Sequence, residues 1–172
     1  NENVGAGDLQ MPENEMHTTS YWLTIPRERM RALPFSLEER RDGVVALAFT
    51  LGQLAALYLM CDRHDLGVAL GDNGQGDARP ERGLMRLGIG RNQEPPPGDD
   101  YEPNIFIYDN YPGGIGLSEP LYHLHDRLLR ESRALIAACE CRDGCPSCVG
   151  PVGEVGSRGK EVALTILDVI HG

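Results

Sequence analysis

Apolar residues recur along this chain at two spacings, one typical of strands and the other of helices. Short runs rich in β-branched and aromatic residues predict strands over residues 17–25, 68–70, 84–89 and 104–109. Apolar positions three and four residues apart predict helices over residues 37–60, 118–138 and 160–170. This order predicts an α+β fold: a mostly antiparallel sheet of three or four strands, two long helices on one face, and a C-terminal helix.

The longest predicted helix carries its own start signal. Ser36 is followed three residues later by Glu39, the pair that forms a capping box. The second half of this helix is apolar on nearly every side, which predicts a central helix buried by its neighbours. Apolar surroundings also predict that Trp22 is a core anchor, with base stacking as the alternative, and that Cys61 is a buried thiol.

Four stretches lack an apolar pattern. Residues 1–16 are polar and Gly-rich, which predicts a disordered segment or linker ahead of a domain at 17–172. Residues 71–83 are predicted to be a mobile loop, residues 92–100 a Pro-rich connection, and residues 149–157 a further loop. The chain opens on acidic and polar residues and lacks a long apolar run, so we expect no signal peptide, no membrane span and a soluble protein.

Cysteines supply the most specific chemistry, because four of them lie within ten residues: Cys139, Cys141, Cys145 and Cys148. Thiolates this close can converge on one tetrahedral zinc ion, and Gly144 and Pro146 supply the tight turns that such a knuckle needs. Four protein ligands leave no position for a reactive water, so the predicted site is structural. Two disulfides or an iron–sulfur cluster are the alternatives. The odd cysteine count favours a reducing, intracellular setting.

The charge balance argues against a free-standing nucleic-acid binder. The chain has 26 acidic and 16 basic residues and a formal net charge of −10, whereas phosphate binding depends on Lys and Arg. Lysine occurs only once, as Lys160. Arg27, Arg29 and Arg31 cluster near one another and are the candidate nucleic-acid contacts, with a solvated surface as the other interpretation.

A Gly-rich turn at residues 111–116 (Tyr-Pro-Gly-Gly-Ile-Gly) lies between a predicted strand and a predicted helix, where phosphate-binding loops occur. It lacks the lysine and the hydroxyl that a P-loop places on phosphate and Mg²⁺. We therefore expect a backbone turn that requires positive φ, and no ATP hydrolysis by this segment.

Carboxylates and imidazoles form a second candidate cluster, a metal or nuclease site built from Asp62, His64, Asp65, Asp109, His123 and His125. Aspartates commonly cap turns after helices and strands, which is the alternative role. The last two histidines are two positions apart in a predicted helix and so would not share a face. We therefore predict no catalytic residue in this chain.

Four segments together resemble one known family: residues 17–22, 59–67, 107–117 and 139–151. The third contains the Tyr-Pro-Gly-Gly-Ile-Gly turn and the fourth contains the cysteine cluster, and these two are the most specific. From residue 17 onward, the chain resembles the C-terminal zinc-binding domain of MrfA-type superfamily 2 DNA-repair helicases, the mitomycin repair factors.

This resemblance implies a parent protein with two RecA-like motor lobes that hydrolyses ATP and moves 3′ to 5′ along single-stranded DNA. It implies one zinc ion bound by the four cysteines, in a domain that helps to guide or gate DNA during repair in the cytoplasm. The expected partners are the motor lobes and, through the parent, single-stranded DNA, with no membrane and no small-molecule substrate. A related domain occurs in a DISARM-type phage-defence component, so a protein-docking module without nucleic-acid contact is the alternative.

Overall fold

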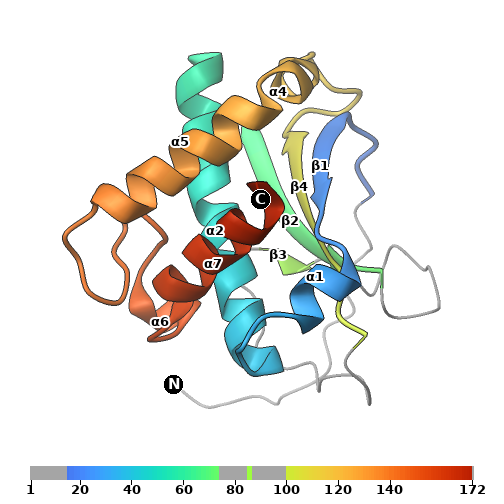
Figure 1. Cartoon of the computed structure of the whole chain (residues 1–172). Helices are drawn as coiled ribbons and strands as arrows, with labels where there is room; N and C mark the ends of the chain where they lie inside the picture. Colours follow the sequence, from blue (N-terminus) through green and yellow to red (C-terminus); the bar gives the residue numbers. More distant parts are fainter. Residues whose placement is uncertain (1–14, 74–84, 87–99, 172) are drawn as a thin grey trace, which may run out of the picture.

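A four-stranded antiparallel sheet forms one layer of the molecule (Figure 1). The computed structural model describes residues 15–73, 85–86 and 100–171. The strand order is β1-β4-β2-β3, with bounds β1 Ser20–Thr24, β2 Leu66–Asp72, β3 Met85–Arg86 and β4 Pro103–Asp109. The predicted strand at 84–89 is thus seen only as β3, and most of the predicted loops at 71–83 and 92–100 lie outside the described residues, as do residues 1–14.

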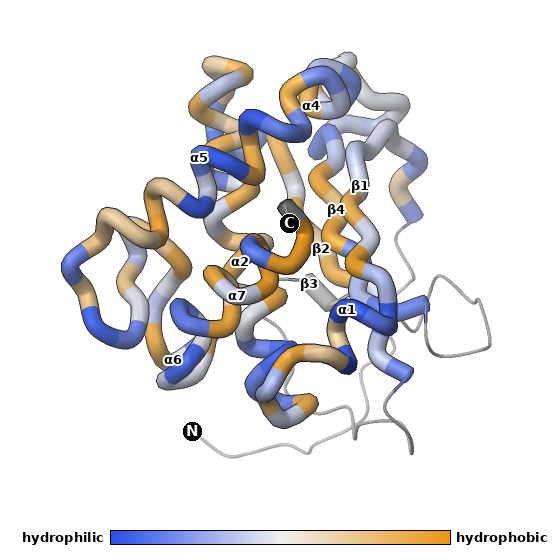
Figure 2. Tube along the Cα trace, viewed as in Figure 1, coloured by the Kyte–Doolittle hydropathy of each residue, from blue (hydrophilic) through white to orange (hydrophobic). Residues whose placement is uncertain are grey.

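Three long helices lie on one side of the sheet (Figure 1). They are α2 (Leu37–Leu59), α5 (His125–Ala138) and α7 (Gly159–His171), and the shorter helices are α1 (Arg27–Arg31), α4 (Glu119–His123) and α6 (Val152–Val155). Helix α2 packs against β2 and β4, while α5 and α7 pack against α2 and against each other. Figure 2 shows apolar residues along each of these elements, and the buried ones form the core between the helices and the sheet. The predicted α+β class is confirmed.

Helix α2 is the central helix, as its sequence predicts. Its N-terminus has the predicted capping box: the Ser36 hydroxyl accepts the Glu39 N–H at 3.2 Å, and a Glu39 carboxylate oxygen accepts the Ser36 N–H at 2.8 Å. The sequence analysis predicts no membrane span, yet α2 is long and apolar enough to cross a membrane by length and composition alone. However, 56% of its apolar window is buried inside the fold, so its apolar residues serve as core.

The predicted helix at 118–138 is divided in two. Leu124 adopts φ −94° and ψ 3°, and its N–H bonds to the carbonyls of Leu121 and Pro120, which closes α4 with a tight last turn. Helix α5 then starts in a new direction at His125, whose Nδ1 lies 2.7 Å from the Tyr21 hydroxyl of β1. The predicted loop at 149–157 likewise contains the one-turn helix α6.

Trp22 lies on the outer face of the sheet, so its prediction as a core anchor is wrong. Successive strand residues point to opposite faces, and in β1 Tyr21 and Leu23 are buried toward the helices. Trp22 is 61% exposed and pairs across the sheet with Phe106 of β4. Cys61 is half-buried against the core rather than fully buried.

Gly43 allows α2 and α7 to approach closely, which leads to a stability prediction. A Cβ atom at this position would lie 2.3 Å from Cγ1 and 2.7 Å from Cβ of Val162 in α7. Helix propensity alone would favour Gly43→Ala by about 1 kcal/mol, whereas forcing a methyl into packed atoms costs about 1–3 kcal/mol. Because the β-branched Val162 side chain is stiff, we expect a net loss in the free energy of unfolding, measured by urea denaturation.

Gly153→Ala in α6 is the matched control, because a Cβ there would meet no atom within 4 Å. It should leave the urea midpoint unchanged or raise it. A Gly43→Ala protein at least as stable as the unchanged chain would contradict the close packing of α2 on α7.

Candidate metal centre

The four clustered cysteines project from the segment that connects α5 to α6. Cys139 is the C-cap of α5, where the backbone turns to an extended conformation, and Cys148 is buried at the end of the segment. Between them Gly144 adopts φ +138°, and a Cβ there would lie 2.9 Å from the Val149 side chain. A glycine is therefore required for the turn that brings the two halves of the knuckle together.

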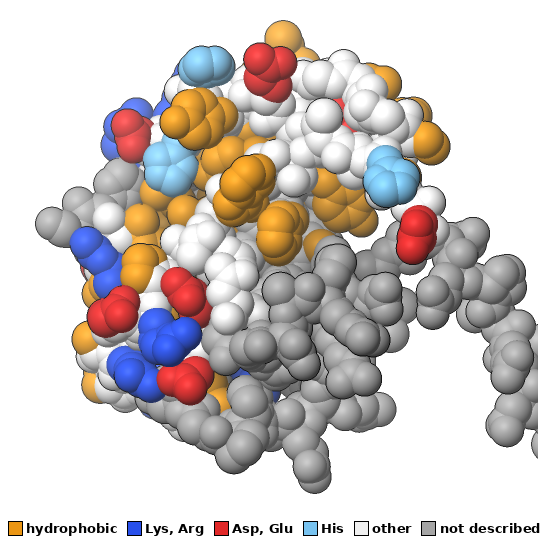
Figure 3. Space-filling view, turned by 90° about the vertical axis from the view of Figure 1, so that its right-hand side faces the viewer, with side chains coloured by type: hydrophobic (Ala, Val, Ile, Leu, Met, Phe, Trp, Pro, Cys, Tyr) orange, Lys and Arg blue, Asp and Glu red, His pale blue; other side chains and the backbone are white. Residues whose placement is uncertain are grey.

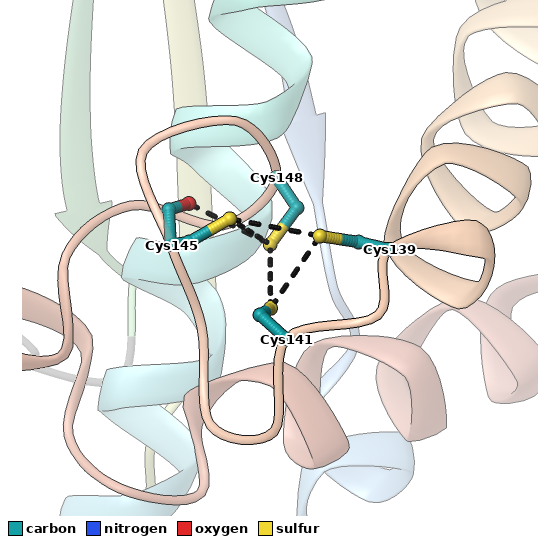
Figure 4. A group of neighbouring side chains, drawn as sticks. All are labelled: Cys139, Cys141, Cys145 and Cys148. Carbon is teal, nitrogen blue, oxygen red and sulfur yellow. Dashed lines mark hydrogen bonds between the residues drawn. The ribbon is translucent and has the colours of Figure 1, made fainter.

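The four sulfur atoms point toward a common centre (Figure 4). The Sγ–Sγ distances are 3.5 Å for Cys139–Cys141, 3.6 Å for Cys139–Cys145, 3.4 Å for Cys141–Cys148 and 3.6 Å for Cys145–Cys148. Zinc–thiolate bonds of about 2.3 Å in a tetrahedron place sulfur atoms about 3.8 Å apart. The cluster is thus suited to hold one zinc ion.

The same distances weigh against the two alternatives. A disulfide joins its sulfurs at about 2.05 Å, and all five cysteines have free thiols in the structure. An iron–sulfur cluster holds its thiolates around a core of several atoms and needs a wider arrangement than one ion does. A single tetrahedral ion fits the donor set best.

Two polar side chains of α2 fix the backbone of the knuckle. The buried Thr50 hydroxyl donates to the Cys148 carbonyl at 3.0 Å, and the Gln53 side-chain amide donates to the Pro146 carbonyl at 3.0 Å. Sequence reasoning did not assign either residue to the site. The available signal was that both are polar in the otherwise apolar second half of α2.

Two thiols of the cluster differ in acidity. A hydrogen bond from the Ser147 backbone N–H, together with bonds among the sulfurs, lowers the pKa of Cys145 to about 7. Burial raises the pKa of Cys148 to about 12. Since zinc binds thiolates, metal loading must displace the proton that burial keeps on Cys148, and acid should favour metal release.

The three candidate nucleic-acid arginines lie in α1, and each has a partner within the fold. Arg27 and Arg31 both pair with Asp100, at 3.4 Å and 2.6 Å, and Arg29 donates to the Val169 carbonyl of α7. All three would have to exchange or share these partners to reach a phosphate. Their role in nucleic-acid contact stays a prediction.

The predicted cluster of carboxylates and imidazoles is not brought together as a metal site. Within the ranges that the structure describes, the four cysteines are the only group of three or more metal-type side chains that could hold an ion. Asp62 lies 2.6 Å from the His64 ring nitrogen two residues away, and Asp65 accepts the Tyr111 hydroxyl at 2.5 Å. His125 forms a hydrogen bond with the Tyr21 hydroxyl, and the ring of His123 packs edge-on against the ring of Tyr122.

Asp109 is buried and holds the Gly-rich turn. Its carboxylate accepts four backbone N–H groups at 2.7–3.0 Å, from Ile115, Gly116, Leu117 and Ser118. Burial raises the pKa of this carboxyl, but the backbone hydrogen bonds outweigh burial and hold the pKa below its usual range. The alternative role, capping a turn, is therefore the one that the structure supports for Asp109.

The turn itself has the predicted backbone. Gly113, Gly114 and Gly116 have φ of +84°, +73° and +86°. At Gly114 a Cβ would also lie 2.4 Å from the Thr19 hydroxyl oxygen. The turn therefore needs glycine for its conformation and for close contact with the residues before β1.

Comparisons with known proteins agree with this site. A family model described as the MrfA Zn-binding domain matches residues 47–149. The chain is 33% identical over 167 residues to the ATP-dependent helicase YprA of Bacillus subtilis, a match covering 97% of this chain and 19% of that protein. An uncharacterised protein of Methanocaldococcus jannaschii is 49% identical over 45 residues, covering 26% of this chain and 40% of that protein.

A solved structure has the same fold. The crystal structure of the DUF1998 helicase MrfA bound to DNA matches with a TM-score of 0.67 and 32% identity, over 98% of this chain and 19% of that one. The chain thus spans 19% of the length of each of the two helicases. Because the family model covers more than half of the chain, including Cys139, Cys141, Cys145 and Cys148, the chain belongs to the MrfA Zn-binding domain family.

Proposed function

We propose that this chain is the zinc-stabilised accessory domain of an ATP-dependent helicase and helps to guide single-stranded DNA past the motor during DNA repair. ATP binding, hydrolysis and 3′ to 5′ movement belong to the motor lobes of the parent protein, its main partner, in the cytoplasm. The four cysteines are the zinc ligands, and zinc holds the end of α5 near the start of α7. This domain itself contributes no catalytic group.

The observation that carries the DNA role is a row of three aromatic side chains on the face of the sheet that the described helices leave uncovered. Trp22 of β1 is 61% exposed, and the half-buried Phe106 lies opposite it in β4. Tyr108, two residues further along β4, points to the same face and is also half-buried. Apolar side chains gather in the middle of this face (Figure 3). Aromatic rings on a sheet provide flat surfaces on which successive bases stack.

The second candidate is a protein-docking module with no nucleic-acid contact, as in the DISARM-type alternative. It is favoured by the net charge of −10 and by the pairing of Arg27 and Arg31 with Asp100. Bases that stack on the aromatic row need cations for their phosphates, and the charge balance supplies few.

Titration with a single-stranded oligonucleotide separates the two candidates. Trp22 is the chain's sole tryptophan, so its fluorescence reports on the sheet face directly. We expect the oligonucleotide to quench Trp22 fluorescence, and we expect its binding to weaken as the salt concentration is raised from low to moderate. Trp22→Ala should weaken binding of a labelled oligonucleotide about 5- to 160-fold, because stacking contributes about 1–3 kcal/mol per base.

Tyr122→Ala is the matched control, since Tyr122 is an aromatic residue of α4 that is 75% exposed. It should bind like the unchanged chain. Substitution of Arg27, Arg29 and Arg31 by Gln should reduce the salt dependence if these residues contact phosphate. Unchanged fluorescence and no binding at low salt would reject the DNA role and favour protein docking.

A further inference from the structure

Lys160 contacts the cysteine cluster from α7. Its Nζ donates to the carbonyls of Cys139 and Cys141 at 2.5 Å and 2.7 Å, and it lies 3.7 Å from the Cys141 sulfur. The side chain is half-buried and lies in the first turn of the helix. Lys160 is also the only lysine in the chain, in which arginine supplies every other basic residue.

The chemistry of a four-thiolate site explains why an ammonium group suits this position. One Zn²⁺ with four thiolates carries a net charge of −2, and Cys148 is fully buried, so part of that charge is poorly solvated. A cation that donates an N–H to a ligand sulfur spreads this charge, and outer-sphere partners also fix the orientation of the ligands. A compact ammonium has three donors, which matches the three cysteine atoms that Lys160 contacts.

We propose that Lys160 is an outer-sphere positioning residue of the zinc centre, which offsets the negative charge of the cysteines and joins the start of α7 to the metal. The two carbonyls that it bonds belong to the first two ligands, just after α5. Metal loading therefore favours the docking of α7, and docking of α7 in turn favours metal binding. This inference rests on zinc binding by the four cysteines and does not depend on the DNA role.

Zinc affinity tests the proposal directly. We would measure it by competition with a chromogenic chelator for the unchanged chain, Lys160→Met and Lys160→Arg. Loss of an outer-sphere partner typically lowers metal affinity about 10- to 100-fold, and we expect that range for Lys160→Met. Lys160→Arg keeps the charge but not the compact ammonium. The zinc affinity of this variant should therefore lie between those of the unchanged chain and Lys160→Met. Cobalt substitution should shift the sulfur-to-metal charge-transfer band in Lys160→Met.

Arg142→Gln is the matched control. Arg142 lies inside the knuckle sequence, but its side chain is 94% exposed and its carboxylate neighbour Asp143 is 3.7 Å away. This variant removes one positive charge beside the cysteines without removing a contact to them. We expect less than about a twofold change in zinc affinity. Equal affinities for Lys160→Met and the unchanged chain, or equal losses for Lys160→Met and Arg142→Gln, would overturn the proposal.

Amine labelling supplies a second test that does not require a variant to fold. Because Lys160 is the sole lysine, acetylation by a limiting reagent can occur at only two amines, Lys160 and the N-terminal amine. We expect zinc to slow the labelling of Lys160 relative to chelated protein, with the labelling rate of the N-terminal amine as internal reference, because Nζ then stays bonded to the ligand cysteines. Equal labelling rates with and without zinc would contradict the proposal. A chain that binds no zinc at all would overturn both this inference and the zinc assignment.

Discussion

Replacing Cys145 by serine should abolish stoichiometric zinc binding and unfold much of the C-terminal third of the chain. Cys145 is one of four sulfurs that lie within 4.8 Å of one another, and three ligands no longer close a structural zinc site. Zinc supplies about 10–16 kcal/mol to small zinc-finger peptides, so losing even half of that removes much of the about 5–15 kcal/mol by which domains are stable. Elemental analysis should give one zinc per unchanged chain and less in the variant.

The structural consequence follows from the packing around the knuckle. Val149 and Val155 flank it and are buried against the core, and Thr50 donates to the Cys148 carbonyl. Once the metal is lost, the knuckle backbone is no longer held in place against these side chains. Hydrogen exchange should therefore rise first between residues 139 and 171, while the sheet stays protected.

Cys61→Ser is the matched control, because Cys61 is a free thiol outside the cluster. It should keep one zinc per chain. Both variants are best compared under reducing conditions, where the remaining thiols cannot form disulfides. A fully folded, metal-free unchanged chain would show that the cysteines are not a structural metal site.

Replacing Asp109 by alanine should destabilise the fold by about 1–3 kcal/mol, the cost of leaving the buried Ser118 N–H without a partner, because water can reach the exposed Ile115 and Gly116. Four backbone N–H groups, from Ile115 to Ser118, lose their acceptor at once. Asp109→Asn should also destabilise, because its amide places a donor where one carboxylate oxygen now accepts. Urea denaturation monitored by Trp22 fluorescence measures the loss.

The same interaction predicts a pH dependence. The pKa of Asp109 is lower in the folded chain than its usual value, so the carboxylate contributes stability above the pKa of the unfolded chain. That contribution disappears as the pH falls through the folded pKa. We therefore expect the difference in the free energy of unfolding between the unchanged chain and Asp109→Asn to be constant near neutral pH. This difference should narrow below about pH 4.

Asp62→Asn is the control for the loss of a carboxylate. The Asp62 carboxylate is exposed, and its hydrogen bonds are local, to the backbone and ring of His64. Hydrogen bonds from the His64 backbone and ring hold the pKa of Asp62 below its usual value, but the carboxylate is exposed, so its substitution should change the urea midpoint much less than Asp109→Asn does. If Asp109→Asn behaved like Asp62→Asn, the Gly-rich turn would not depend on its buried carboxylate.

Local features of the fold were predictable because neighbouring residues determine them. The capping box of Ser36 and Glu39, the positive φ of the glycines in the turn, and the strand β4 depend on residues a few positions apart. The division of the helix at 118–138 was missed, since its apolar spacing continues through Leu124, whereas His125 begins a separate helix and bonds Tyr21 of a distant strand.

The candidate site was predictable for a similar reason. Four cysteines within ten residues can meet at one ion whatever the rest of the chain does, and the sulfur positions agree with that prediction. The residues that support the knuckle were not predictable. Thr50 bonds a carbonyl 98 positions away, and nothing in its immediate sequence indicates that partner.

By itself, the sequence determined the α+β class, the caps and turns, and the convergence of four thiolates. Only the tertiary structure decided that Trp22 lies on the open face of the sheet, that Asp109 holds a turn and that Lys160 reaches the cysteines. The physical reason is that alternation or helical spacing defines the faces of an element, whereas the choice of buried face depends on which distant segments pack against it. The same packing selects the partner of each polar side chain.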